Sequence, residues 1–221
     1  MPRYDIRELN SRAVKASVEL VSQITVGDLG RPTPCSEWAL GELLAHMTVQ
    51  HRGFAAAAAG RGADPRVWQA GSPGADPVGG YAEAAEAVLA AFAGEGAADR
   101  QFALPEIAAG TTFPGRQAMA FHFVDYVVHG WDVARSLGAG FEPDPEVLTV
   151  ALEVARAVPD GPGRLEPGSA FRPPVAAPAD AGSLDQIVAL LGRRPDWPRL
   201  SAPFPARQRP QRPALRLSHE R

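Results

Sequence analysis

The sequence predicts an all-α protein, and three observations support this prediction. From Asp5 to Leu29, large apolar residues recur at spacings of three to five, which is typical of an amphipathic helix. Prolines and glycines gather between long stretches that contain few of either, so they mark the ends of helices. The alternating apolar and polar pattern of β-strands is scarce along the chain. We therefore expect helices joined by turns.

Two long helices are predicted in the N-terminal part of the chain. The first covers residues 5–29, which contain no proline and no glycine before Gly27. The second follows a segment with two prolines, with Ser36 as the expected N-cap and Glu37 in the first turn, where a negative charge complements the helix dipole. This second helix is expected to end near Gly60.

Further helices are expected after residues 60–80, which are rich in Gly, Pro, Asp and Ser and are predicted to form a surface connection. Each of these helices is bounded by capping or helix-breaking residues. Their predicted ranges are 81–92, 115–138, 144–158 and a short segment capped by Ser183.

Length and composition are those of an ordinary globular protein with one main domain. The chain has 221 residues, of which 45% are hydrophobic and 21% charged. We expect a folded domain over residues 1–198 and an Arg/Pro-rich, disordered tail over residues 199–221. The formal net charge of −3 gives the domain no broad positive field, which argues against nucleic-acid binding.

The single cysteine and the N-terminal residues predict a cytoplasmic protein. Cys35 has no partner for an internal disulfide, and the first ten residues lack the apolar core of a signal peptide. The apolar run from Phe54 to Ala59 is far shorter than the roughly 20 residues needed to cross a bilayer, so we expect no contact with a membrane.

Four of the five histidines fall on two predicted helices, which prompts a metal hypothesis. Asp125 and His129 are four residues apart, so their side chains lie on one helix face about 6 Å apart. His46 on the second helix could supply a third ligand. Such a His/His/carboxylate site leaves a coordination position open for water or substrate.

The same pattern also fits a simpler interpretation. His122, Asp125, His129, Asp132 and Ser136 form one polar stripe, and such a stripe is usually the solvated face of a helix. His46 then lies at the edge of an apolar stripe as an ordinary boundary residue. His51 is expected to be exposed, and His122 is expected to be a surface residue or a partner of a metal ligand.

Two more residues have alternative roles. Asp132, three residues after His129, either accepts a hydrogen bond from that imidazole and so orients it, or is a surface charge. Cys35 is either a small residue packed at the start of a helix or a nucleophile, and the first reading is favoured.

Three sequence blocks resemble a known family. Thr33–Met47, TPCSEWALGELLAHM, resembles the TPC-x-x-W-x-x-x-x-L-x-x-H signature of an actinobacterial family in the DinB-like superfamily, which includes the mycothiol-dependent maleylpyruvate isomerases. Asp125–Gly138, DYVVHGWDVARSLG, resembles the family block D/E-x-x-x-H-x-W-D-L-A-x-x-x-G. LLGRRPDW, residues 190–197, resembles its closing motif.

The resemblance implies an up-down-down-up four-helix bundle with short additional C-terminal helices. It also implies a divalent metal, commonly zinc or nickel, held by His46, Asp125 and His129. The isomerase pattern has glutamate where this chain has Asp125, and a related branch has histidine, so this position tunes the site. Polar ligands of such bundles point between the helices, which favours the metal hypothesis over the solvated stripe.

The resemblance further implies chemistry with a low-molecular-weight thiol such as mycothiol or bacillithiol. A bound metal would stabilise the thiolate for transfer to, or isomerisation of, a small electrophilic substrate. The ligand set does not choose between thiol transfer, isomerisation and metal-assisted hydrolysis. Homodimers are common in families of this kind.

Two other functions stay open at this point. In one, the bundle is a non-catalytic metal- or ligand-binding regulator whose tail from Ala202 to Arg221 contacts an acidic partner. In the other, the tail binds nucleic acid, although the net charge of −3 gives it little support from the rest of the chain.

Overall fold

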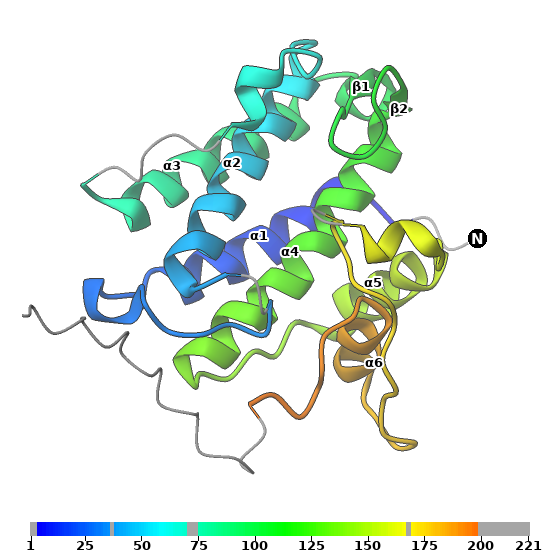
Figure 1. Cartoon of the computed structure of the whole chain (residues 1–221). Coiled ribbons are helices and arrows are strands. Elements are labelled where there is room, and N and C mark those ends of the chain that lie inside the picture. The colour runs from blue at the N-terminus through cyan, green and yellow to red at the C-terminus, as the bar shows by residue number, and fades with distance from the viewer. Residues whose placement is uncertain (1–3, 36–37, 70–74, 167–168, 199–221) are drawn as a thin grey trace, which may run out of the picture.

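Four long helices form a bundle in the computed structural model, which describes residues 4–35, 38–69, 75–166 and 169–198. Helix α1 packs chiefly against α4, and α2 packs chiefly against α3 (Figure 1). The structure therefore confirms the predicted all-α helical bundle. The bundle helices are α1 (Ile6–Val21), α2 (Leu40–Ala58), α3 (Pro77–Ala93) and α4 (Gly115–Leu137).

Smaller elements surround this bundle. Helices α5 (Pro145–Ala157) and α6 (Ser183–Leu190) pack on each other beside α4 (Figure 1). Strands β1 (Gln101–Ala103) and β2 (Thr112–Pro114) pair in an antiparallel hairpin before α4. The sequence did not predict this hairpin, because three residues are too few to show an alternating pattern. The 3-10 turns span Val26–Asp28, Pro65–Trp68, Ala97–Asp99 and Pro162–Leu165.

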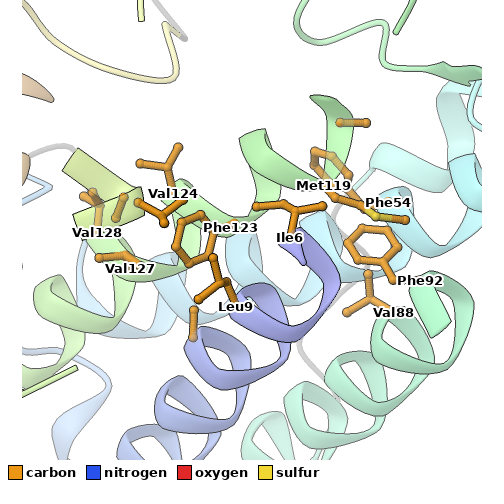
Figure 2. Close-up of a cluster of buried hydrophobic side chains, with 14 of the residues drawn as sticks. Ile6, Leu9, Phe54, Val88, Phe92, Met119, Phe123, Val124, Val127 and Val128 are labelled. Carbon is orange, nitrogen blue, oxygen red and sulfur yellow. The ribbon is translucent and has the colours of Figure 1, made fainter. Parts of the chain in front are cut away.

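Apolar side chains from all four bundle helices fill the interior in two clusters. The first surrounds Ile6, Phe92 and Phe123, each at most 1% exposed (Figure 2). The second surrounds Met47 and Tyr126, both 0% exposed. Burial of each large side chain stabilises the fold by about 1.5–3 kcal/mol, so these clusters hold α2 and α4 in fixed positions.

Helix α1 ends at Val21, earlier than the predicted Leu29. Asp28 accepts hydrogen bonds from the backbone N–H and the hydroxyl of Thr25, which starts a separate 3-10 turn. Val26 is 85% exposed, so the apolar spacing continues to a residue that does not pack in the core. The pattern alone could not show this.

Helix α2 begins at Leu40, later than the sequence indicated. Its N-cap is Ala39, whose backbone N–H donates to the Glu42 carboxylate at 2.8 Å. The prediction of Ser36 as the N-cap was therefore wrong about the helix start, and Ser36 itself lies outside the described residues, as does Glu37. Glu42 is the acidic group in the first turn.

Residues 60–80 are more structured than the predicted surface connection. Trp68 is 8% exposed, packs edge-on against Phe54, and donates from its indole N–H to the Gly62 carbonyl at 2.8 Å. Helix α3 begins at Pro77 instead of Tyr81, because proline is favoured in the first turn and Asp76 caps the N-terminus.

The remaining predicted helices lie where the sequence placed them. Helix α4 ends at Gly138, whose φ of 72° is in the left-handed region that favours glycine. Asp144 caps α5 by accepting from the N–H groups of Glu146 and Val147. Ser183 was predicted to cap α6, but it is the first residue of this helix, and Gly182 is the N-cap.

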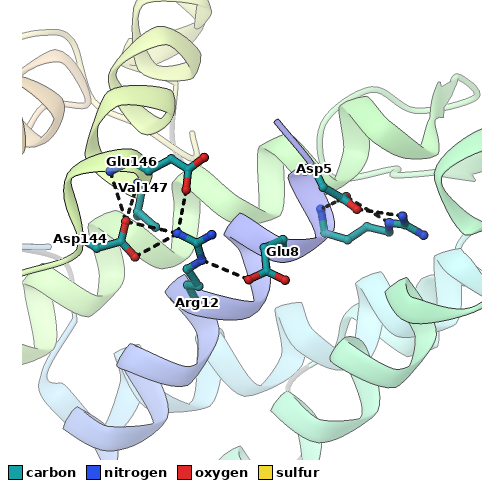
Figure 3. A network of polar contacts seen from close by, with 7 residues as sticks. Asp5, Glu8, Arg12, Asp144, Glu146 and Val147 are labelled. Atoms are coloured by element: carbon teal, nitrogen blue, oxygen red, sulfur yellow. Dashed lines mark hydrogen bonds and ion pairs between the residues drawn. The ribbon is translucent and has the colours of Figure 1, made fainter. Parts of the chain in front are cut away.

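A surface network ties α5 to α1. Arg12 on α1 donates to Glu8, Asp144 and Glu146 (Figure 3). All four side chains are more than one third exposed, so solvent screens each ion pair and its contribution to stability is small. The apolar contacts of α5 with α4 and α6 matter more for its position.

Two arginines hold the C-terminal extension in place, one within the extension and one on α4. Arg164 is 6% exposed and donates to four backbone carbonyls, including that of Leu190 at the end of α6. Arg135 on α4 donates to the carbonyls of Pro195 and Trp197. The contacts of Arg135 bring residues 195–197 beside the C-terminal end of α4. The predicted tail at 199–221 lies outside the described residues.

None of the described helices is both long and apolar enough to span a membrane.

Candidate metal centre

Helices α2 and α4 bring together the side chains of His46, Asp125 and His129. One ligand atom from each residue lies within 4.8 Å of the other two. His129 Nε2 is 3.4 Å from Asp125 Oδ1, and the ring centroids of His46 and His129 are 5.4 Å apart. The separation in sequence is large, so packing of α2 near α4 creates this cluster.

A carboxylate fixes the orientation of His129. Its Nδ1 lies 3.0 Å from Asp132 Oδ2, and both side chains are at most 2% exposed. Because an ionised carboxylate only accepts, Nδ1–H donates to Asp132, which leaves Nε2, on the Asp125 side, as the ring nitrogen that could bind a cation. Asp132 is therefore a buried orienting group, and the alternative of a surface charge is wrong.

Arg193 from the C-terminal extension is the counter-charge of Asp132. Its Nη2 lies 3.3 Å from Asp132 Oδ2, and its side chain is only 4% exposed. Burial by itself would raise the pKa of Asp132, but the positive charge of Arg193 and the hydrogen bond from His129 together lower it below its usual value. Asp132 thus stays ionised while buried, and it continues to accept from His129.

His46 is a neutral imidazole at physiological pH. Burial, with a smaller contribution from the nearby His129, lowers its pKa to about 4. A neutral ring offers a nitrogen lone pair to a cation. The indole of Trp38 lies against this ring with centroids 4.4 Å apart, which restricts its orientation.

Cys35 lies at the edge of this cluster. Its sulfur is 3.7 Å from Arg193 Nη2, and the residue is partly buried. Burial raises the pKa of the thiol to about 11, more than the arginine charge lowers it. A thiol that remains protonated at neutral pH is a poor nucleophile, so the structure favours the packing role predicted for Cys35.

The polar stripe of α4 is not a solvated face. His122 and Asp132 are 0% exposed, His129 is 2% exposed and Ser136 is 8% exposed. The helix lies between α1, α2 and the C-terminal extension, which cover these positions. Asp125 retains 19% side-chain exposure. The sequence pattern was misleading because it does not show how many neighbours surround a helix.

His51 and His122 form a separate, fully buried group. His51 Nδ1 is 3.1 Å from His122 Nε2, and His122 Nδ1 is 2.7 Å from Asn10 Oδ1 on α1. The expectation that His51 is exposed was wrong, and so was the surface alternative for His122. Neither ring belongs to the cluster of His46, Asp125 and His129.

The ligand atoms of His46, Asp125 and His129 fit a divalent cation. Two imidazoles and one carboxylate are typical ligands of zinc and related ions. Two ligand atoms bound tetrahedrally at 2.0–2.1 Å are roughly 3.3 Å apart, close to the 3.4 Å between His129 Nε2 and Asp125 Oδ1. Three protein ligands leave one coordination position open.

Sequence reasoning identified no role for Arg193 or Trp38. Both lie in the blocks that carry the family resemblance, TPCSEW and LLGRRPDW, so the signal was present. A motif alone does not show which of its side chains points inward. The contacts with Asp132 and His46 supply that information.

Comparison with known proteins connects this chain to one family. Residues 11–134, which include the three clustered residues, match the family model described as the mycothiol maleylpyruvate isomerase N-terminal domain. The chain is also similar to two uncharacterized proteins of Mycobacterium tuberculosis, MT0763 of strain CDC 1551 / Oshkosh and Rv0738 of strain H37Rv. Each is 31% identical over 189 residues, covering 83% of this chain and 95% of the relative. No solved structure matches the chain.

Proposed function

The chain belongs to the mycothiol maleylpyruvate isomerase N-terminal domain family, and from this premise we propose that it is a divalent-metal-dependent enzyme that uses a low-molecular-weight thiol. The thiol is mycothiol or a similar molecule, and it is transferred to, or assists the isomerisation of, a small electrophilic substrate. The observation that carries the proposal is the convergence of His46, Asp125 and His129 to within 4.8 Å.

In this proposal His46, Asp125 and His129 hold the metal, with zinc or nickel as the expected ion. A bound divalent ion supplies Lewis acidity, which favours the thiolate form of a coordinated thiol at neutral pH. The remaining requirements fall to the protein: neutral imidazoles, a fixed ligand geometry and access for the thiol.

Asp132 and Arg193 maintain the geometry of one ligand. Asp132 accepts the Nδ1 proton of His129, so the ring cannot rotate without breaking a buried hydrogen bond. Arg193 balances the charge of Asp132 and contacts the same carboxylate oxygen, Oδ2, as His129. Together they keep Nε2 of His129 directed toward the metal position.

The partial exposure of Asp125 indicates from where a thiol reaches the site. Its side chain is 19% exposed, whereas that of His129 is 2% exposed. The thiol therefore enters from the side of Asp125, and Trp38 covers His46 on another side. A site that is partly exposed at Asp125 and His46 and buried at His129 suits the binding of one small thiol.

The first experiment measures metal content. We expect about one equivalent of zinc or nickel in protein purified from cells, and loss of most of this metal in His46→Gln and His129→Gln. Glu83→Gln, an exposed position on α3, serves as the matched control. Retention of metal in both histidine variants would contradict the proposal.

The second experiment measures thiol use by the metal-loaded protein. We expect saturable consumption of mycothiol with an electrophile such as a haloarene, and loss of turnover when a chelator removes the metal. Metal binding without any thiol binding or turnover would instead support the non-catalytic regulator that the sequence left open.

A further inference from the structure

We propose that a strip of four residues beside the metal ligands binds a neutral, hydroxyl-rich part of the thiol, and this inference rests on the function proposed above. The strip consists of Gln50, Glu106, Phe113 and Phe121. Two of these residues come from α2 and α4, and the other two from the β1–β2 hairpin.

The strip lies one helical turn from the metal ligands. Gln50 follows His46 by four residues on α2, and Phe121 precedes Asp125 by four residues on α4, so each lies on the same helix face about 6 Å from a ligand. The β1–β2 hairpin packs against both α2 and α4 and lies next to the start of α4 (Figure 1). It therefore adjoins both Gln50 and Phe121.

Exposure along α4 connects the strip with the metal ligands. Among residues 121–130, Phe121 and Asp125 are partly exposed and all the others are buried. Gln117, one turn further toward the hairpin, is exposed. A ligand bound at Asp125 that extends along α4 therefore meets Phe121 next.

The polar groups of the strip are hydrogen-bond acceptors. Gln50 is 8% exposed, and its side-chain amide donates to Glu106 Oε2 at 2.6 Å, which holds the hairpin loop on α2. The other amide atom, Oε1 of Gln50, accepts no hydrogen bond from the described residues. Glu106 is exposed, and it forms no ion pair with any of the described residues. These oxygens are available to accept from hydroxyl groups.

The apolar part of the strip is an aromatic pair. The rings of Phe113 and Phe121 meet edge-on with centroids 5.3 Å apart, and both side chains are partly exposed. A flat aromatic surface beside a carboxylate and an amide suits a sugar or cyclitol, which presents a C–H face and several hydroxyls. The Glu106 carboxylate disfavours a ligand that carries its own carboxylates at this place.

Three thiols test the proposal by calorimetry on the zinc-loaded full chain. N-acetylcysteine, used as its uncharged amide throughout, is the thiol head alone, mycothiol adds a neutral sugar and cyclitol, and bacillithiol carries a sugar with two carboxylates. We expect mycothiol to bind at least about tenfold more tightly than N-acetylcysteine, since one or two charge-assisted hydrogen bonds supply such a factor. We also expect it to bind more tightly than bacillithiol.

Two variants locate the effect. Gln50→Leu should weaken mycothiol binding by about tenfold and leave N-acetylcysteine unchanged. Glu106→Gln removes the charge from an exposed loop without endangering folding, and it should reduce the preference for mycothiol over bacillithiol by about tenfold. Glu153→Gln, exposed on α5, is the matched control and should change none of the affinities.

The two proposals fail in different ways. Equal affinities for the three thiols, or affinities that neither variant changes, would overturn the inference about the strip while leaving a metal-bound thiol in place. Failure of N-acetylcysteine itself to bind the zinc-loaded chain would contradict the proposed function, and the inference would fall with it.

Discussion

Helices α2 and α4 carry two pairs of histidines with opposite surroundings. His46 and His129 lie beside a partly exposed carboxylate and make no hydrogen bond to each other. His51 and His122 are hydrogen-bonded to each other at 3.1 Å and are both 0% exposed. We call His46 and His129 the open pair, and His51 and His122 the sealed pair. Their ring centroids are 5.4 Å and 5.1 Å apart, respectively, so the distance between the rings does not distinguish the two pairs.

The difference lies in how the ring nitrogens are used. In the sealed pair, Asn10 Oδ1 accepts from His122 Nδ1–H, so His122 Nε2 must accept from His51 Nδ1–H. In the open pair, Asp132 accepts from His129 Nδ1–H and leaves Nε2 directed at Asp125. The same residue type on the same two helices is thus a packed polar layer in one place and a set of candidate metal donors in the other. Neighbouring acceptors decide which.

Removing the charge of Asp132 should have the largest effect and would test the open pair. Asp132→Asn leaves the buried Arg193 without a counter-charge, which typically costs about 3–5 kcal/mol of stability. It should also weaken metal binding by about 10- to 100-fold, because His129 loses the partner that orients it. Urea unfolding and metal titration measure the two effects. Unchanged metal affinity would show that Asp132 does not act through His129.

Removing one ring of the sealed pair should have the next largest effect and should spare the metal. His122→Leu leaves the Nδ1–H of His51 and Asn10 Oδ1 unpaired in the core, and we expect a loss of roughly 2–4 kcal/mol. The metal content should stay at the parent level. Urea unfolding and elemental analysis of the same preparation measure both quantities, and loss of metal would show that the two pairs are coupled.

The sealed pair should also make the stability of the protein depend on pH, with a smaller effect than the substitutions above. Burial lowers the pKa of His122 to about 3, well below its unfolded value of about 6.5. As pH falls below 6.5 the unfolded chain binds a proton that the folded chain excludes, so stability decreases toward the folded pKa. Between pH 6.5 and 5.0 this amounts to about 2 kcal/mol, and it should be missing in His122→Leu. Parallel pH profiles of the two metal-free proteins would contradict this assignment.

The sequence predicted the open pair better than the sealed one. Spacing placed Asp125 and His129 on one helix face with His46 as a possible third ligand, and the resemblance implied all three; the structure brings them together. Burial of His51 and His122 escaped prediction because it depends on Asn10 of α1 and on the packing of α4 between its neighbours. Whether the three side chains bind a metal stays a prediction.

The ends of the helices also differ in whether the sequence predicted them. The end of α4 at Gly138 was predictable because capping by glycine is a local effect. The end of α1 at Val21 was not, since apolar spacing continues to Val26 while the core does not. Arg193 reaches Asp132 through the fold of the C-terminal extension, a contact between residues 61 positions apart. No local pattern encodes a contact of that kind.

The smallest expected effect concerns Tyr126, which lies between the two pairs. Its ring stacks on His51 and His122 with centroids 4.0 Å and 4.3 Å away, and its hydroxyl donates to the Met47 carbonyl, next to His46. Tyr126→Phe keeps the stacking and removes only the hydroxyl. The Met47 carbonyl can still accept a backbone bond within α2, so we expect a loss of about 1 kcal/mol in urea unfolding. Metal affinity should stay within twofold of the parent if the pairs are independent. A tenfold change would mean that this hydroxyl transmits the position of α4 to His46, so the sealed layer would then be part of the metal centre.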